Sequence, residues 1–253
     1  MKRAGAALIL FPALMLAGCD ETRPRPEAEP SEALVFPAAD RPVAPIVSSR
    51  WSTEEARDRL NEADTVMDLA EIRPGTTVAD IGAGEGYYTV RLSARVGPKG
   101  RVLAEDIVPE VRDALAQRVA RERLDNVSVR LGEADDPKLP DNSFDRILMV
   151  HMYHEIAEPY EFLWRMRPSL RSDGLVVVVD ADRSTENHGT PPALLKCEFA
   201  AVGYRLVAMR DMPSAGGYLA MFRAEGPRPD PAAIRPCPNR PAPRVAGKPM
   251  GDE

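Results

Sequence analysis

The sequence has few of the residues that build disulfide frameworks and zinc clusters. Its 253 residues include three cysteines and three histidines, and no pair of cysteines has C-x-x-C spacing. A surplus of basic residues is also missing, because 33 Lys and Arg stand against 39 Asp and Glu, for a net charge of −6. Nucleic-acid binding usually needs a basic patch, so we expect no nucleic-acid partner.

The apolar segment near the N-terminus is too short for a comfortable membrane span. It covers residues 6–16, follows two basic residues and leads into LAGC at residues 16–19. A basic start, a short apolar core and small residues before a cut point predict a secretory signal peptide over residues 1–19. The last four residues resemble the lipobox of bacterial lipoproteins, which implies cleavage before Cys19 and lipidation of its thiol, for example with palmitate.

The lipobox resemblance also implies a location in the cell envelope. Asp20 follows the cysteine and resembles an inner-membrane retention mark. We therefore expect the protein at the periplasmic face of the bacterial inner membrane, held by its lipid anchor, with the outer membrane as the alternative. The competing interpretations are a signal peptide with an ordinary cysteine and an uncleaved anchor helix.

Both ends of the remaining chain are rich in proline and predict little packed structure. Residues 20–49 combine Pro, Glu and Ala without a useful amphipathic period, which is typical of an extended linker. Residues 226–253 repeat that composition and predict a disordered tail. The folded domain is therefore expected over residues 50–225.

Two cysteines remain besides Cys19, one in a predicted helical segment and one in the tail. An oxidising compartment would permit Cys197 and Cys237 to form a disulfide that pins the tail to the domain. The alternative, which we favour, is a buried Cys197 and an unpaired Cys237.

An apolar run that ends in an acid, followed by a glycine turn, organises the domain. Residues 78–89 read VADIGAGEGYYT, and a helical pattern follows the G-x-G-x-G turn. Glycines at such a turn permit positive φ and let the backbone approach a ligand, while the next helix presents free N–H groups. The turn predicts a cofactor loop, although the same turn also occurs as a plain strand-to-helix connection.

Three further apolar runs end in polar residues. They cover residues 100–107, 126–136 and 144–151, and they close on Glu105-Asp106, on an acidic loop and on His151. The carboxyl ends of parallel strands meet at one sheet edge, where ligands bind in open α/β sheets. The acids of the first of these runs stand where a ribose-binding carboxylate belongs in a βαβ nucleotide site.

The alternation of strand and helix patterns predicts the fold class. An unbroken apolar run at residues 175–180 is typical of a central strand buried on both faces. Residues 204–212 and 218–224 are joined by a short turn and predict a terminal hairpin. We expect a doubly wound, seven-stranded, Rossmann-like α/β sheet that is parallel except for an antiparallel last strand. Ahead of it, the S-x-x-E pattern at residues 52–55 predicts the start of a helix.

Four motifs of the domain follow one another in a characteristic order and spacing: VADIGAGEGYYT, GRVLAEDIVPE, LPDNSFDRILMV and MYHEI. Together they resemble the class I S-adenosylmethionine-dependent methyltransferases over about residues 50–225. The resemblance implies S-adenosylmethionine as the cofactor and methyl transfer as the reaction. It also implies that the helices before the first strand sit over the cofactor mouth, and the alternative is that they pack on one sheet face.

The same resemblance implies a set of cofactor residues. They are Asp80, Gly82, Ala83, Gly84, Asp106, Ile107, Ala134 and Asp135. The first would orient the loop and the methionine ammonium, and the glycines would admit a close approach of the backbone. Asp106, with Glu105 as a less favoured choice, would take the ribose hydroxyls. The last two would meet the adenine, with Glu133 or Asp136 as alternatives to the second of them.

All three histidines fall after the fourth and fifth strands, at the predicted ligand edge. One hypothesis is that His154, with Glu155, deprotonates a hydroxyl, thiol or amine acceptor, because a histidine pKa lies near neutral pH. A second hypothesis is a metal site with ligands from His151, His154, Glu155 and Asp180 or Asp182. The spacing H-x-x-H-E is not a standard zinc helix motif, so we assign no metal. Surface or capping histidines are the third interpretation.

The predicted location and the predicted chemistry disagree, because the methyl donor is made in the cytoplasm and a lipoprotein lies outside it. Three interpretations follow: a membrane-tethered methyltransferase with a small-molecule acceptor, a nucleoside-binding protein without turnover, and a structural lipoprotein whose domain holds partners. The glycines and loop acids stand where a working site needs them. We therefore predict the enzyme, with an unidentified acceptor.

Overall fold

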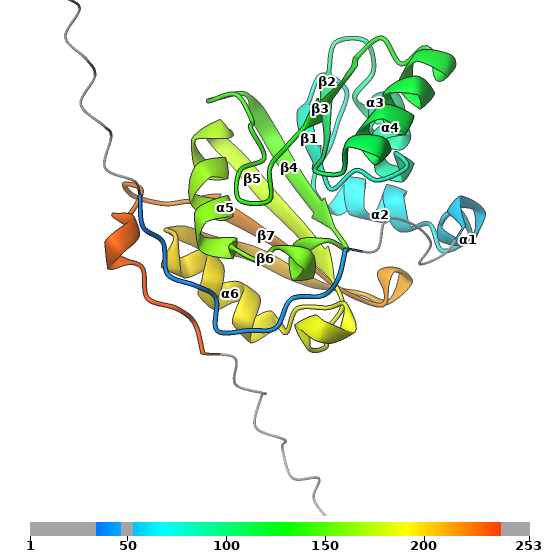
Figure 1. The fold of residues 1–253 in the computed structure, drawn as a ribbon. Helices are drawn as coiled ribbons and strands as arrows, with labels where there is room; N and C mark the ends of the chain where they lie inside the picture. The colour runs from blue at the N-terminus through cyan, green and yellow to red at the C-terminus, as the bar shows by residue number, and fades with distance from the viewer. Residues whose placement is uncertain (1–33, 47–52, 239–253) are drawn as a thin grey trace, which may run out of the picture. The chain divides into compact units, whose positions relative to one another are not determined.

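A seven-stranded sheet has the strand order β3-β2-β1-β4-β5-β7-β6 (Figure 1). The computed structural model describes residues 34–46 and 53–238. The strands are β1 (Thr77–Ile81), β2 (Arg101–Asp106), β3 (Val127–Leu131), β4 (Phe144–Val150), β5 (Leu170–Asp180), β6 (Tyr204–Met212) and β7 (Gly217–Ala224). β7 runs antiparallel to both β5 and β6, and the other neighbouring pairs are parallel. The predicted doubly wound α/β sheet with an antiparallel last strand is confirmed.

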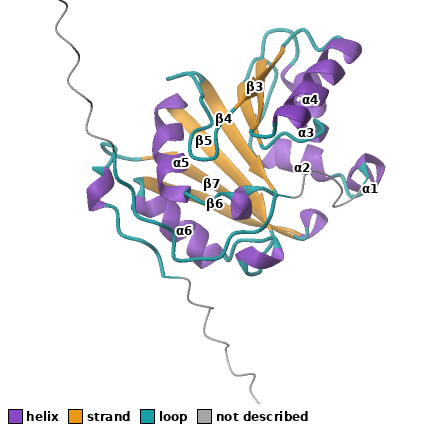
Figure 2. Cartoon of the chain, viewed as in Figure 1, coloured by secondary structure: helices purple, strands orange, loops and turns teal. Residues whose placement is uncertain are grey.

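Helices cover both faces of the sheet (Figure 2). They are α1 (Glu54–Arg59), α2 (Glu62–Leu69), α3 (Tyr87–Val96), α4 (Pro109–Glu122), α5 (Pro159–Met166) and α6 (Pro192–Ala201). Successive side chains of a strand point to opposite faces. β5 accordingly sends Val176 and Val178 into the core with α5 and α6, and its alternate valines into the core with α2 and α3. The apolar run at residues 175–180 is thus a central strand buried on both faces, as predicted.

Short 3-10 helices lie in several connections between these elements and after β7. They are η1 (Tyr153–Glu155), η2 (Arg167–Ser169), η3 (Thr185–Asn187), η4 (Pro213–Ala215) and η5 (Pro231–Ala233). η1 follows β4 and η3 follows β5, so both lie at the carboxyl edge of the sheet. Their residues therefore belong to the edge where the ligand site was expected.

The first helix differs from its prediction in its N-cap residue. Thr53, not Ser52, is the N-cap: its Oγ1 accepts a hydrogen bond from the backbone N–H of Ala56 at 3.2 Å. Ser52 lies outside the described residues. The helical pattern is interrupted at Asn61, which takes a left-handed φ of 53° and separates α1 from α2. The chain therefore forms two short helices before β1.

The Ser-Asp-Gly sequence at residues 172–174, a pattern typical of turns, lies inside β5. The strand begins at Leu170, and a register shift between Phe144 and Arg146 of β4 absorbs the additional residues. A Cβ on Gly174 would lie 2.7 Å from the carbonyl oxygen of Phe144, so glycine is needed for the close approach of the two strands. The turn signal of Ser-Asp-Gly therefore marks a strand irregularity instead of a chain reversal.

The predicted linker is packed against the domain over residues 34–46, which pass α5 and α6 (Figure 1). The guanidinium of Arg41 is buried and donates to Glu198 Oε1 of α6 at 2.8 Å and to the carbonyl of Ile156 at 3.1 Å. The backbone N–H of Ala44 donates to the carbonyl of His154 at 3.1 Å. The predicted domain start at residue 50 is therefore too late, because these contacts fix the segment without regular secondary structure.

The predicted tail is packed against the domain as far as residue 238. Cys237 forms a disulfide with Cys197 of α6, and both Cys237 and Ile234 are buried. The indole N–H of Trp164 donates to the carbonyl of Pro229 at 2.8 Å. The predicted boundary at residue 225 and the unpaired Cys237 are therefore wrong. The covalent bond and the buried apolar residues hold a segment that its proline content alone predicts to be disordered.

The predicted signal peptide and lipobox at residues 1–19 lie outside the described residues. Within the part of the chain that is described, no helix combines the length and the apolar character needed to cross a bilayer.

Candidate functional site

A cavity of about 1270 Å³ lies at the carboxyl edge of the sheet. Six of the eight predicted cofactor residues line one wall of it, which we call the glycine wall. They are Gly82, Ala83, Gly84, Asp106, Ile107 and Ala134. A second wall, the histidine wall, consists of His151, Glu155 and His188, which follow β4 and β5. One cavity thus brings together residues that are more than 100 positions apart in the sequence.

The glycine loop exposes backbone to the cavity at Gly84. This residue has a φ of 55°, and a Cβ built on it would meet no atom within 4 Å. Gly86 has a φ of 89°, but a Cβ there would lie 2.5 Å from Leu115 of α4. At Gly86 the positive φ favours glycine and the space is filled by Leu115, whereas Gly84 leaves open space in which a ligand can approach the backbone.

The carboxylate of Asp106 is fixed by two backbone donors. Its Oδ2 accepts from the N–H of Gly84 at 3.0 Å, and its Oδ1 accepts from the N–H of Val108 at 2.9 Å. An ionised carboxylate has about four acceptor positions, so two remain for a ligand's hydroxyl groups. This geometry and the open space at Gly84 fit a nucleoside-type cofactor.

Glu105 is directed into the protein although it borders the cavity. Its side chain is buried, and burial, followed by the negative charge of Asp106, raises its pKa to about 8. The carboxylate lies against Gly132, where any Cβ would overlap it. Among the described residues, its Oε1 has no hydrogen-bond partner. Of the two adjacent acids, Asp106 is the one with the preorganised carboxylate.

Asp80 lies behind the glycine loop and not on the cavity wall. Its Oδ2 accepts from the hydroxyl of Thr89 at 2.6 Å and so ties the end of β1 to α3. Burial raises its pKa to about 6, with a further contribution from Asp106. These contacts support the predicted orientation of the loop by Asp80, but the structure places it away from the position for a direct ligand contact.

The acidic loop after β3 contributes Ala134 to the cavity, while its three acids do not line it. Glu133 and Asp136 pair instead with the ammonium of Lys138, at 3.0 Å and 3.7 Å. The structure therefore does not place Asp135, which the sequence predicts as an adenine contact, on the cavity wall.

His154 is fully buried and does not line the cavity. Its Nδ1 lies 3.0 Å from Asp180 Oδ1. Asp180 in turn accepts from the hydroxyl of Thr190 at 2.7 Å and from the N–H of Ala181 at 2.8 Å. A carboxylate so placed keeps the proton on Nδ1 and leaves the lone pair on Nε2. Within the described residues, Nε2 has no hydrogen-bond partner.

The three histidines do gather at the predicted edge. His151 and His188 both have a φ of 56° and both line the cavity. The rings of His154 and His188 meet edge to face, with their centroids 5.4 Å apart. His151 instead lies beside Glu62, its Nε2 3.7 Å from Oε1. No separate role was predicted for His188, because its contact with His154 depends on how the loop after β5 folds back.

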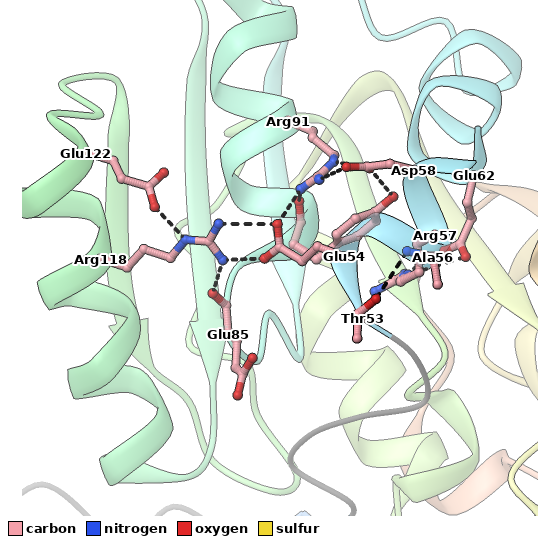
Figure 3. A network of polar contacts seen from close by, with 11 residues as sticks. Thr53, Glu54, Ala56, Arg57, Asp58, Glu62, Glu85, Arg91, Arg118 and Glu122 are labelled. Atoms are coloured by element: carbon pink, nitrogen blue, oxygen red, sulfur yellow. Dashed lines mark hydrogen bonds and ion pairs between the residues drawn. The ribbon is translucent and has the colours of Figure 1, made fainter. Parts of the chain in front are cut away.

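Helix α1 lies over the glycine loop and is held there by ion pairs (Figure 3). Glu54 accepts from Arg91 of α3 at 3.1 Å and from Arg118 of α4 at 2.6 Å. Arg118 also donates to the carbonyl of Glu85 in the glycine loop at 2.8 Å. α1 has no buried residue, whereas α2 packs into the core. Both alternatives for these helices therefore hold: α1 covers the cavity, while α2 packs on the sheet and places Glu62 on the cavity wall.

Comparison with known proteins matches this part of the chain to methyltransferases. Residues 79–178 match the methyltransferase domain family. Nocamycin O-methyltransferase from Saccharothrix syringae is 41% identical over 83 residues, which are 33% of this chain and 30% of that protein. A ubiquinone/menaquinone biosynthesis C-methyltransferase from Hahella chejuensis is 30% identical over 125 residues, 47% of this chain and 48% of the relative. The chain spans less than half the length of both.

Solved structures share the fold. A SAM-dependent methyltransferase from Aquifex aeolicus superposes with a TM-score of 0.58 at 23% identity, over 68% of this chain and 97% of that one. The [4+2]-cyclase SpnF superposes with a TM-score of 0.56 at 14% identity, over 74% of this chain and 100% of that one. The chain therefore has the Rossmann-like methyltransferase fold. Together with the relatives, this fold implies S-adenosylmethionine as the cofactor, as predicted.

Proposed function

We propose that this protein is an S-adenosylmethionine-dependent methyltransferase that acts on a small-molecule acceptor. The observation that carries the proposal is a single cavity lined both by the glycine wall and by the ionisable side chains of the histidine wall. When bound, the cofactor supplies an electrophilic methyl group on a sulfonium. The protein's main task is then to hold the acceptor in line with that group.

The glycine wall would bind the cofactor. The carboxylate of Asp106, already oriented by two backbone N–H groups, would accept the ribose hydroxyls. Gly84 would allow the ligand to approach the backbone, and Ala134 would border the adenine. α1, fixed by its ion pairs with α3 and α4, would restrict the access of water to this side.

The histidine wall would meet the acceptor. Glu155 lines the cavity and is the group best placed to take a proton from the acceptor. His154, the predicted base, lies behind that wall and has no solvent-exposed surface. Its base role remains a prediction, and the geometry favours Glu155 for direct contact.

We also propose that the protein is exported and tethered to the membrane through a lipidated Cys19. The lipobox-like LAGC sequence supports the proposal. So does the disulfide between Cys197 and Cys237, because structural disulfides form in oxidising compartments such as the periplasm. Metabolic labelling with radioactive palmitate tests the tether: we expect a labelled protein in the membrane fraction. Cys19→Ala should lose the label, and a label that persists in this variant would contradict the proposal.

Titration calorimetry of the purified full-length chain tests the enzyme proposal. We expect micromolar binding of S-adenosylmethionine and S-adenosylhomocysteine. Asp106→Ala should weaken binding roughly 10- to 100-fold, because about 1.5–3 kcal/mol of charge-assisted hydrogen bonding is lost. Asp113→Ala is the matched control, since among the described residues this exposed α4 carboxylate pairs with its neighbour Arg112 and does not line the cavity.

The outcomes separate the three interpretations. Binding followed by methyl transfer to a compound in an acceptor screen supports the enzyme. Binding without transfer to any acceptor favours a nucleoside-binding protein. A folded protein that gives no heat with either ligand would favour the structural lipoprotein.

A further inference from the structure

We propose that His154, Glu155 and His188 form a site for a divalent transition metal, with zinc as the best-matched ion. One donor atom from each residue lies within 4.8 Å of the other two. The site would stand at the histidine wall of the cavity, apart from the residues assigned to the cofactor. The proposal concerns metal binding itself and does not depend on methyl transfer.

The spacing of the donor atoms suits a tetrahedral ion. Zinc binds histidine nitrogen and carboxylate oxygen at about 2.0–2.2 Å, so two ligands of one tetrahedral ion lie about 3.4 Å apart. The three donor atoms are at most 4.8 Å apart without an ion. Glu155 and His188 are only partly buried, so small side-chain rotations can bring their donors to bonding distance of an ion near His154.

His154 provides the independent observation that a ligand belongs there. The side chain is fully buried, yet Nε2 has no hydrogen-bond partner among the described residues. An imidazole nitrogen buried without a partner loses its hydration and gains nothing in return. A metal ion on Nε2 would remove that deficit.

The contacts behind His154 are those that metal-binding histidines have. Such histidines donate the other ring N–H to a carboxylate, which fixes the tautomer and raises the basicity of the ligating nitrogen. Here Nδ1 of His154 lies 3.0 Å from Oδ1 of Asp180. The carboxylate is itself held by Thr190 and by the N–H of Ala181. The imidazole is therefore oriented with Nε2 as its free donor atom.

Two histidines and one carboxylate favour zinc over magnesium or calcium, which prefer oxygen ligands. Three protein ligands leave one coordination position open, as in catalytic zinc sites. Since Glu155 and His188 line the cavity, that position would face the cavity. If the proposed function is correct, that position would receive an oxygen or sulfur atom of the acceptor, and Glu155 would act as a zinc ligand and not as the proton acceptor.

Zinc titration of the chelator-treated full-length chain, without cofactor, tests the site. We expect one equivalent of Zn²⁺ to bind at micromolar concentration or tighter and to raise the melting temperature. His188→Asn should weaken binding at least 100-fold. His151→Asn is the matched control, because His151 has the same φ of 56° and also lines the cavity. Asparagine tolerates this left-handed conformation at both positions, and the control should bind zinc within threefold of the unmodified chain.

A second variant and a second metal keep the test independent of folding defects. Glu155→Gln should weaken zinc binding while circular dichroism remains unchanged. Co²⁺ should give the visible absorption of a site of low coordination number, and acetohydroxamate, an oxygen chelator, should shift that absorption if the open position faces the cavity. Absence of one-equivalent binding would overturn the site, and so would zinc affinity unchanged in both His188→Asn and Glu155→Gln.

The results distinguish this site from the proposed function. Zinc binding in a protein that does not bind S-adenosylmethionine would retain the metal site and remove the methyltransferase. Cofactor binding without zinc binding would retain the proposed methyltransferase and remove the metal site.

Discussion

The glycine wall and the histidine wall of the cavity take their form from different kinds of interaction. The glycine wall follows β1, β2 and β3, and backbone N–H groups orient its central carboxylate, that of Asp106. The histidine wall follows β4 and β5 and is fixed by contacts between side chains, such as that of His154 with Asp180. A site made from backbone at strand ends leaves a local sequence motif, whereas a site made from side chains on separate turns does not.

The two walls also differ in the contacts that hold the neighbouring segments in place. Above the glycine wall, α1 is held by exposed or half-exposed ion pairs and has no buried residue. Behind the histidine wall, residues 34–46 are joined to α6 by a buried ion pair and to His154 by a backbone hydrogen bond, and residues 226–238 are joined to α6 by a disulfide. The covering of the glycine wall therefore depends on partly exposed ion pairs, whereas the segments behind the histidine wall are held by buried and covalent contacts.

Removal of the disulfide should have the largest effect on stability. The bond between Cys197 and Cys237 closes a loop over a sequence separation of 40. Replacing both cysteines by serine should lower the free energy of unfolding by about 2–5 kcal/mol, because the unfolded chain regains freedom. Thermal denaturation measures the loss, and reduction of the unmodified protein should mimic it. If the two walls are supported separately, S-adenosylhomocysteine should still bind the variant at a temperature where it is folded.

Glu105→Gln should have an intermediate, pH-dependent effect at the glycine wall. The pKa of Glu105 is raised from 4.5 to about 8, so the unfolded chain loses this proton at lower pH than the folded chain. The contribution of Glu105 to stability therefore falls as the pH rises from about 4.5 to 8. Glutamine keeps the shape of the protonated acid and removes this dependence.

Denaturant unfolding at several pH values measures the difference. We expect Glu105→Gln to match the parent near pH 4 and to exceed it by about 1–3 kcal/mol near pH 9. A variant less stable than the parent at both pH values would show that the ionised carboxylate is stabilised by interactions that the structure does not contain.

Glu54→Gln should have the smallest effect and should act on the covering helix. The hydrogen bonds of Glu54 to Arg118 and Arg91 lower its pKa, so the network stabilises the ionised form of this side chain. Because partly exposed ion pairs contribute about 0.2–1 kcal/mol, cofactor binding should weaken no more than about fivefold. Calorimetry at low and high salt checks the cause: salt should weaken binding to the parent more than to the variant. Equal salt dependence would exclude a role for these ion pairs in closing the cavity.

The features that depend on local sequence patterns were mostly predicted correctly. The sheet, its antiparallel last strand and the position of Asp106 beside the glycine turn follow from periodicity and spacing. Asp80 and Asp135 lie off the cavity wall, and periodicity and spacing do not predict this. Their positions depend on the side-chain direction at a strand end and in a loop.

Long-range pairings account for the remaining differences. Proline-rich composition predicted loose ends, yet a disulfide and the buried pair of Arg41 with Glu198 hold parts of both. His188 gained its importance only from its contact with His154, which lies 34 positions earlier and follows another strand. Glu155, in contrast, was already a candidate, and the structure places it on the cavity wall.

The division of the cavity into a cofactor side and an acceptor side is the central claim, and a crystal structure with S-adenosylhomocysteine tests it most directly. We predict that the ribose hydroxyls contact the carboxylate of Asp106, that the adenine lies beside Ala134, and that the sulfur faces Glu155 and His188. A ligand with its adenine among the histidines and no contact to Asp106 would contradict the account.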